Sequence, residues 1–169
     1  MESSAKERIK NEAERILGDN YVVSPPIEID EIAANYGLEL VEADFNDYAT
    51  TISGFIDGQS IFVNEKDSTD RQAVTVAVLL ARFILYRDKL STDGAYNVLR
   101  RIPLGEMEGP VEEESLYFAA NLLIPENLLE KYKDHDANNL AKIFGVPADF
   151  LGYRLELEFG RNGAQEKYA

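Results

Sequence analysis

Residues 71–86 read RQAVTVAVLLARFILY. Nearly every position from 74 to 85 is apolar, so this segment predicts a helix that is enclosed on all sides by the rest of the domain. The exception is Arg82. A buried guanidinium is costly unless it is paired, so we expect either a carboxylate beside Arg82 or an extended side chain that reaches solvent with only its stem covered.

The segments before this helix predict a small sheet. Residues 4–17 have the spacing of an amphipathic helix, and residues 31–36 form a shorter helix that Gly37 ends. Residues 38–41, 51–56 and 60–63 are typical of strands, and the last two form a hairpin across Asp57 and Gly58.

The segments after it predict further helices. Residues 87–108 have weak periodicity and form either a loop or a marginal helix, and helices follow at 111–124, 126–132, 137–144 and 148–158. We therefore expect an α+β fold in which a small three-stranded antiparallel sheet packs on helices. One domain accounts for residues 1–169, with a core over about 25–158 and a flexible tail over 159–169.

The composition limits the partners. Thirty-one acidic and seventeen basic residues give a formal net charge of −14, which disfavours direct binding of nucleic acid and attracts basic surfaces, or simply keeps the protein soluble. Cysteine is absent, no apolar signal region opens the chain, and the apolar run 76–81 is too short for a bilayer. We expect a cytoplasmic protein that does not enter a membrane.

Two motifs give the chain a resemblance to a known family. Arg71, Gln72, Thr75 and Ala77 match a helix that reads R-Q-x-F-T-x-A-H-E-x-G-H, and residues 114–125, ESLYFAANLLIP, match a second helix that reads E-A-N-x-F-A-A-x-L-L-M-P. Both belong to the ImmA/IrrE family of zinc metallopeptidases, which residues 26–38 and 140–147 also resemble. The resemblance implies a zincin-like minimal metallopeptidase core and covers most of the chain.

The metal-binding residues of that family are replaced here. A zinc helix of this kind needs two imidazoles at i and i+4, with a carboxylate beside the first as general base. By the resemblance, the imidazole positions hold Val78 and Arg82, the base position holds Leu79, and the position of a further histidine holds Tyr86. Glu114 alone matches a ligand.

The chain's one histidine, His135, lies in a polar stretch typical of a turn and could not supply two ligands. We therefore expect no bound metal, no cofactor and no hydrolysis by the family mechanism. Instead, we expect Arg82 and Glu114 to form an ion pair that joins the two helices as zinc would.

By resemblance, a catalytically inactive member of this family acts by binding a regulatory protein, such as a helix-turn-helix repressor of a phage or mobile element. The hairpin could accept an extended peptide by strand addition, with contacts from the residues Ile52, Gly54, Phe55, Ile61 and Phe62. Two alternatives remain open. The chain could be an acidic mimic of nucleic acid that blocks a DNA-binding protein, or an enzyme with an unrecognised site.

Overall fold

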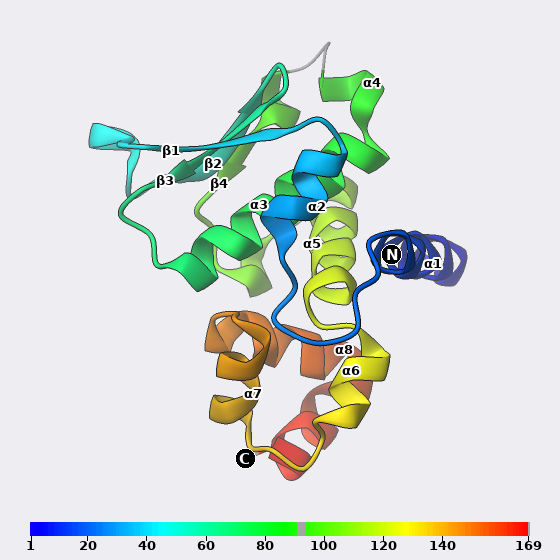
Figure 1. Cartoon of the computed structure of the whole chain (residues 1–169). Coiled ribbons are helices and arrows are strands. Elements are labelled where there is room, and N and C mark those ends of the chain that lie inside the picture. Colours follow the sequence, from blue (N-terminus) through cyan, green and yellow to red (C-terminus); the bar gives the residue numbers. More distant parts are fainter. Residues whose placement is uncertain (91–93, 169) are drawn as a thin grey trace.

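The computed structural model describes residues 1–90 and 94–168, and its sheet and helices form an α+β fold (Figure 1). The sheet has four strands in the spatial order β1-β3-β2-β4. These strands are β1 (Glu39–Ala43), β2 (Ile52–Asp57), β3 (Ser60–Asn64) and β4 (Val98–Arg100). The short 3-10 helix η1 (Asn46–Tyr48) lies between β1 and β2.

The prediction of three antiparallel strands is wrong in two respects. The hairpin of β2 and β3 forms as expected, but β1 pairs with β3 in the parallel direction. In addition, β4 adds a strand along the other side of β2. An alternating pattern shows which face of a strand is buried but does not identify its neighbours, and the three residues of β4 are too few to show alternation.

Helix α3 (Thr69–Leu85) is the enclosed helix expected from the sequence. It packs on the inner face of the sheet, against the buried side chains of Ile56, Ile61 and Val63, and against α5 (Pro110–Leu123). Gly54 permits the close approach of α3 to β2, because a Cβ atom there would lie 2.6 Å from both the Phe62 carbonyl oxygen and Thr75 Cγ2.

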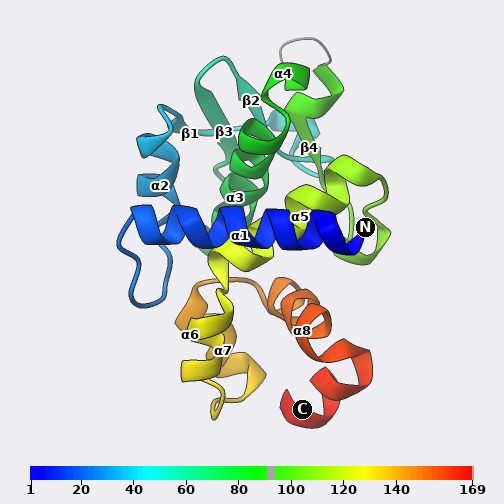
Figure 2. The ribbon, with the colours of Figure 1, turned by 90° about the vertical axis from the view of Figure 1, so that its right-hand side faces the viewer.

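Two N-terminal helices cover other sides of this core. Helix α1 (Ser3–Asp19) lies across α5, as Figure 2 shows, and α2 (Ile29–Asn35) packs against α3. The buried residues of α1 are spaced as one amphipathic face: Ile9, Ala13, Ile16 and Leu17. The sequence therefore predicted both the helix and the face that it buries.

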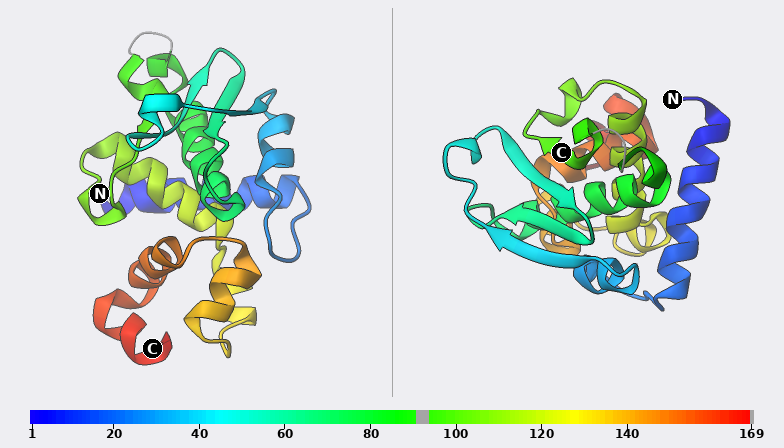
Figure 3. Two further views of the ribbon diagram at one scale, coloured as in Figure 1. Left: turned by 90° about the vertical axis from the view of Figure 1, so that its left-hand side faces the viewer. Right: turned by 90° about the horizontal axis from the view of Figure 1, so that it is seen from above.

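The three C-terminal helices form a layer below α5 (Figures 1 and 3). They are α6 (Glu126–Lys131), α7 (Ala137–Phe144) and α8 (Ala148–Tyr168), which bends at Gly160. Arg154 of α8 is buried, and its Nε donates to the carbonyl oxygen of Ile124 at 3.0 Å, which ties α8 to the end of α5.

Residues 161–168, part of the predicted flexible tail, are helical here, and the side chain of Tyr168 is buried. The predicted flexibility of this segment stays a prediction, and residue 169 lies outside the described residues.

The segment expected to be a loop or a marginal helix contains several short elements. They are α4 (Arg87–Leu90), η2 (Gly94–Asn97), β4 and η3 (Leu104–Glu106), while residues 91–93 of that prediction lie outside the described ranges. This segment matters because β4 and η3 border the candidate site. Across residues 1–90 and 94–168, no helix has the length and the apolar character needed to cross a membrane.

Candidate functional site

A cleft lies between β4 with its following segment and the helices α3 and α5. It consists of two pockets of about 670 and 440 Å³ that share four lining residues: Leu99, Arg100, Ile102 and Met107. Arg82 lines the larger pocket and Val78 lines the smaller one. The cleft therefore touches two of the positions where the resemblance places zinc ligands, whereas Glu114 lines neither pocket.

The residues at those positions do not fit a zinc ion. Val78 and Leu79 are 1% and 0% exposed, and neither side chain carries a ligand atom. His135 lies far along the chain, between α6 and α7, where its Nδ1 contacts the Tyr132 carbonyl oxygen at 3.1 Å. Among the described residues, no group of three or more His, Cys, Asp or Glu side chains is arranged to hold a metal.

Arg82, which the resemblance aligns with the second imidazole, is almost fully buried, with 2% of its surface exposed. Its Nη1 donates to the carbonyl oxygens of Tyr96, at 3.2 Å, and Val98, at 2.8 Å. Its Nη2 lies 3.6 Å from Glu112 Oε1, which is an ion pair but too long for a hydrogen bond. Burial lowers the pKa of Arg82, and the Glu112 carboxylate opposes that shift. The guanidinium thus fastens β4 to α3.

The predicted pair of Arg82 with Glu114 is therefore wrong. Glu114 instead accepts a hydrogen bond from the Tyr86 hydroxyl at 2.7 Å and lies 3.5 Å from Nη2 of Arg8 on α1. The cause is helical geometry. Ser115 of α5 is fully buried, and Glu112 lies about 60° from it around the helix whereas Glu114 lies about 100° away on the other side.

Sequence reasoning missed Glu112 and the two carbonyl acceptors. A signal for Glu112 exists, because residues 112, 115 and 119 share one helical face and two of them, Ser115 and Ala119, are small and suited to close packing. No sequence pattern predicts Tyr96 or Val98 as a partner of Arg82. Each contributes a main-chain carbonyl oxygen, which every residue has, so the residue type carries no signal.

Tyr86 links three helices through Glu114, and its environment perturbs its ionisation. Burial and the hydrogen bond to Glu114 raise the pKa of Tyr86 above its ordinary range. Above about pH 10 the unfolded chain releases this phenolic proton while the folded chain keeps it, so the unfolded state binds fewer protons and stability falls as the pH rises.

We therefore expect Tyr86→Phe to lose less stability than the unchanged protein between about pH 8 and pH 10.5. Urea unfolding at the two pH values measures the difference. The control is Tyr48→Phe, whose side chain is 65% exposed, and it should keep the dependence of the unchanged protein. Equal losses in all three proteins would contradict the linkage.

The five residues predicted to bind a partner do not share one surface. Gly54 and Ile61 face the core, Phe55 and Phe62 stack on the opposite face with ring centroids 4.7 Å apart, and Ile52 lines the larger pocket. Alternate residues of a strand point to opposite faces, which explains the division. Strand addition to the hairpin is also blocked, because β1 and β4 occupy its two outer edges.

Comparisons with known proteins agree with this architecture. The peptidase family M78 model, described as an IrrE N-terminal-like domain, matches residues 33–156. A solved structure of a Mycobacterium tuberculosis transcriptional regulator superposes with a TM-score of 0.61 at 18% identity, over 88% of this chain and 47% of that one. This likeness shows a shared fold, and the present chain spans about half the length of that regulator. No curated protein matches the chain.

Proposed function

This chain belongs to the IrrE N-terminal-like family of M78 peptidases, and from that premise we propose that it binds a regulatory protein without cleaving it. The partner in this proposal is a transcriptional regulator of the helix-turn-helix repressor kind, held at the cleft beside α3. The chain would thus use the peptidase framework as a binding module.

One observation carries the proposal: Arg82 lies where the family motif has its second imidazole. Its guanidinium is hydrogen-bonded to two carbonyl oxygens and paired with Glu112, so a fixed positive charge stands at the position where a cation would bind. Two apolar side chains, Val78 and Leu79, fill the positions of the first imidazole and the general base. This arrangement retains a cleft, and the aligned positions carry neither the two imidazoles nor the adjoining carboxylate with which the family motif would hold zinc and activate water.

The regulatory side of the proposal draws on the fold. The Mycobacterium tuberculosis structure that shares it is called a transcriptional regulator, and the ImmA/IrrE resemblance points in the same direction. Because the chain spans about half of that regulator, the assignment of a partner to this chain is part of the proposal.

Measurements of metal content and peptidase activity test the part of the proposal that says the chain does not cleave its partner. After dialysis against zinc, the purified chain is expected to carry well under one zinc per chain by mass spectrometry of metals, and to leave a candidate repressor intact. An M78 peptidase that retains H-E-x-x-H serves as the positive control for both assays. Stoichiometric zinc, or cleavage of the repressor above the rate without protein, would contradict the proposal.

Binding is tested separately. A helix-turn-helix repressor encoded next to this chain's gene should co-purify with it as a complex of intact polypeptides. The net charge of −14 favours a second candidate, a mimic of nucleic acid. The two differ in their response to salt, because a mimic should release its partner almost completely at about 1 M NaCl whereas an apolar cleft should retain much of it.

A further inference from the structure

Arginines gather around the smaller pocket of the cleft although the chain as a whole is acidic. Its lining includes Arg71, Arg100 and Arg101 against a single acid, Asp149. The whole chain, by contrast, has a net charge of −14. Glu108 and Glu112 line the adjoining larger pocket, so the positive rim is confined to the smaller pocket, where it attracts a negatively charged group to one place.

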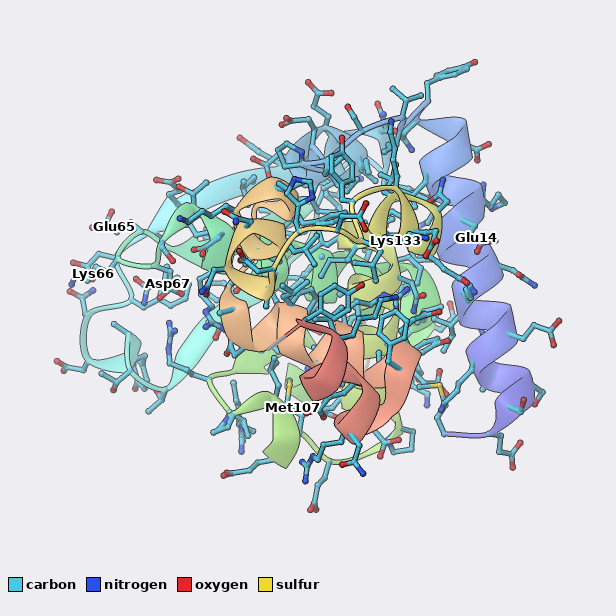
Figure 4. The ribbon with its side chains drawn as sticks, turned by 90° about the horizontal axis from the view of Figure 1, so that it is seen from below. Glu14, Glu65, Lys66, Asp67, Met107 and Lys133 are labelled. Atoms are coloured by element: carbon cyan, nitrogen blue, oxygen red, sulfur yellow. The ribbon has the colours of Figure 1, made fainter. Side chains whose placement is uncertain are left out.

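These arginines differ in their existing partners. Arg71 Nη2 lies 3.0 and 3.1 Å from the two oxygens of Asp149, and Arg101 Nη2 lies 3.0 and 2.8 Å from those of Asp67, which Figure 4 labels on the loop after β3. Arg100 is exposed, and in the described part of the chain no hydrogen bond or ion pair engages its guanidinium. The rim therefore offers one uncommitted cation and two that are already paired.

The floor beneath this rim is apolar. Val74, Val78, Leu99 and Leu116 are buried residues that line the pocket, and the half-buried Met107, labelled in Figure 4, lines both halves of the cleft. Ile102, a large apolar residue, stays 38% exposed at the border. A ligand that fits this site needs an apolar group for the floor and an anionic group for the rim.

We propose that the cleft binds a short acidic and apolar peptide segment, with a Glu or Asp carboxylate on Arg100 and a neighbouring aliphatic side chain over Met107. This inference rests on the proposed function, and it gives the chemistry of the segment that the partner protein supplies. Nucleic acid is a poorer ligand for the same cation, because its backbone carries a charge at every phosphate and the net charge of −14 repels such a polyanion more strongly than a segment with few carboxylates.

Arg82 restricts how the segment is held. The carbonyl oxygens of Tyr96 and Val98 already accept from its Nη1, which makes them poorer acceptors for an added strand beside β4. The proposed recognition therefore relies on side chains, the charge of Arg100 and the surface of Met107.

Fluorescence anisotropy with a labelled, end-capped peptide of alternating glutamate and leucine tests the inference. The matched peptide has glutamine in place of glutamate. We expect the acidic peptide to bind the full chain, and Arg100→Glu to weaken binding by about tenfold or more. Met107→Glu, which places a carboxylate on the apolar floor, should weaken it similarly. Arg161→Glu makes the same charge change on an exposed side chain of α8 and should leave binding unchanged.

Equal binding by the unchanged chain and Arg100→Glu would overturn the inference, as would equal binding of the glutamine peptide. Tighter binding of a single-stranded oligonucleotide through Arg100 would also overturn it. Circular dichroism of each variant separates loss of binding from loss of folding. A repressor that binds the unchanged chain and Arg100→Glu alike leaves the proposed function standing and removes this inference. If the chain binds the acidic peptide through Arg100 but binds no repressor, this inference stands and the proposed function is contradicted.

Discussion

Replacement of Arg82 by methionine is expected to lower the free energy of unfolding by about 2–4 kcal/mol. Methionine is similar in length and tolerates the apolar surroundings, but it donates no hydrogen bond. The carbonyl oxygens of Tyr96 and Val98 then lose their donor in a place where α3 covers them. Because Glu112 is about one third exposed and can turn to water, most of the cost comes from the carbonyl groups.

Urea unfolding at neutral pH, followed by circular dichroism, measures this cost. The matched control is Arg161→Met, since that side chain is 80% exposed and its ion pair with Glu156 is long, at 3.8 Å. The control should change stability by no more than about 0.5 kcal/mol. If Arg82→Met proved as stable as the control, the guanidinium would not be the link between β4 and α3.

Gly54→Ala is expected to destabilise the protein by about 2–3 kcal/mol through overpacking. The added Cβ would lie 2.6 Å from the Phe62 carbonyl oxygen and from Thr75 Cγ2, and 3.2 Å from Leu79 Cδ1. The carbonyl belongs to the paired strand β3, so it cannot move without breaking the sheet. Relief therefore requires β2 to shift against β3 as well as α3 to move away from β2.

The same substitution at Gly152 gives the matched control. Gly152 lies within α8, and an added Cβ there has no neighbour within 4 Å. Gly152→Ala is therefore expected to raise stability by about 0.5–1 kcal/mol, because alanine favours the helix. Thermal or urea unfolding of both variants gives the contrast. A neutral Gly54→Ala would show that the sheet and α3 are less closely packed than described.

The sequence predicted the helices because their signals are local. The apolar run of residues 71–86 predicted α3. The spacing of Ile9, Ala13 and Ile16 predicted α1 together with its buried face. The family motifs drew attention to Val78 and Arg82 on one face of α3, and each of these residues lines one of the two pockets of the cleft. Such information resides in short stretches of chain.

What the sequence did not predict depends on contacts between distant segments. The parallel pairing of β1 with β3 arises from the path of the chain, and no residue in either strand encodes the direction of its neighbour. The need of Arg82 for a partner was predicted correctly, but the partners are carbonyl oxygens of a segment without regular pattern and a carboxylate two residues before the expected one.

The link between Arg82 and β4 also affects how a zinc site could be introduced into this chain by single substitutions. A histidine at position 82 alone would remove the donor that holds β4, and a histidine at position 78 alone would place an imidazole among apolar side chains. Each single step toward a zinc site thus passes through a less stable protein before any metal compensates. An arginine at position 82 that is hydrogen-bonded to β4 is therefore an obstacle to building a zinc site by single substitutions.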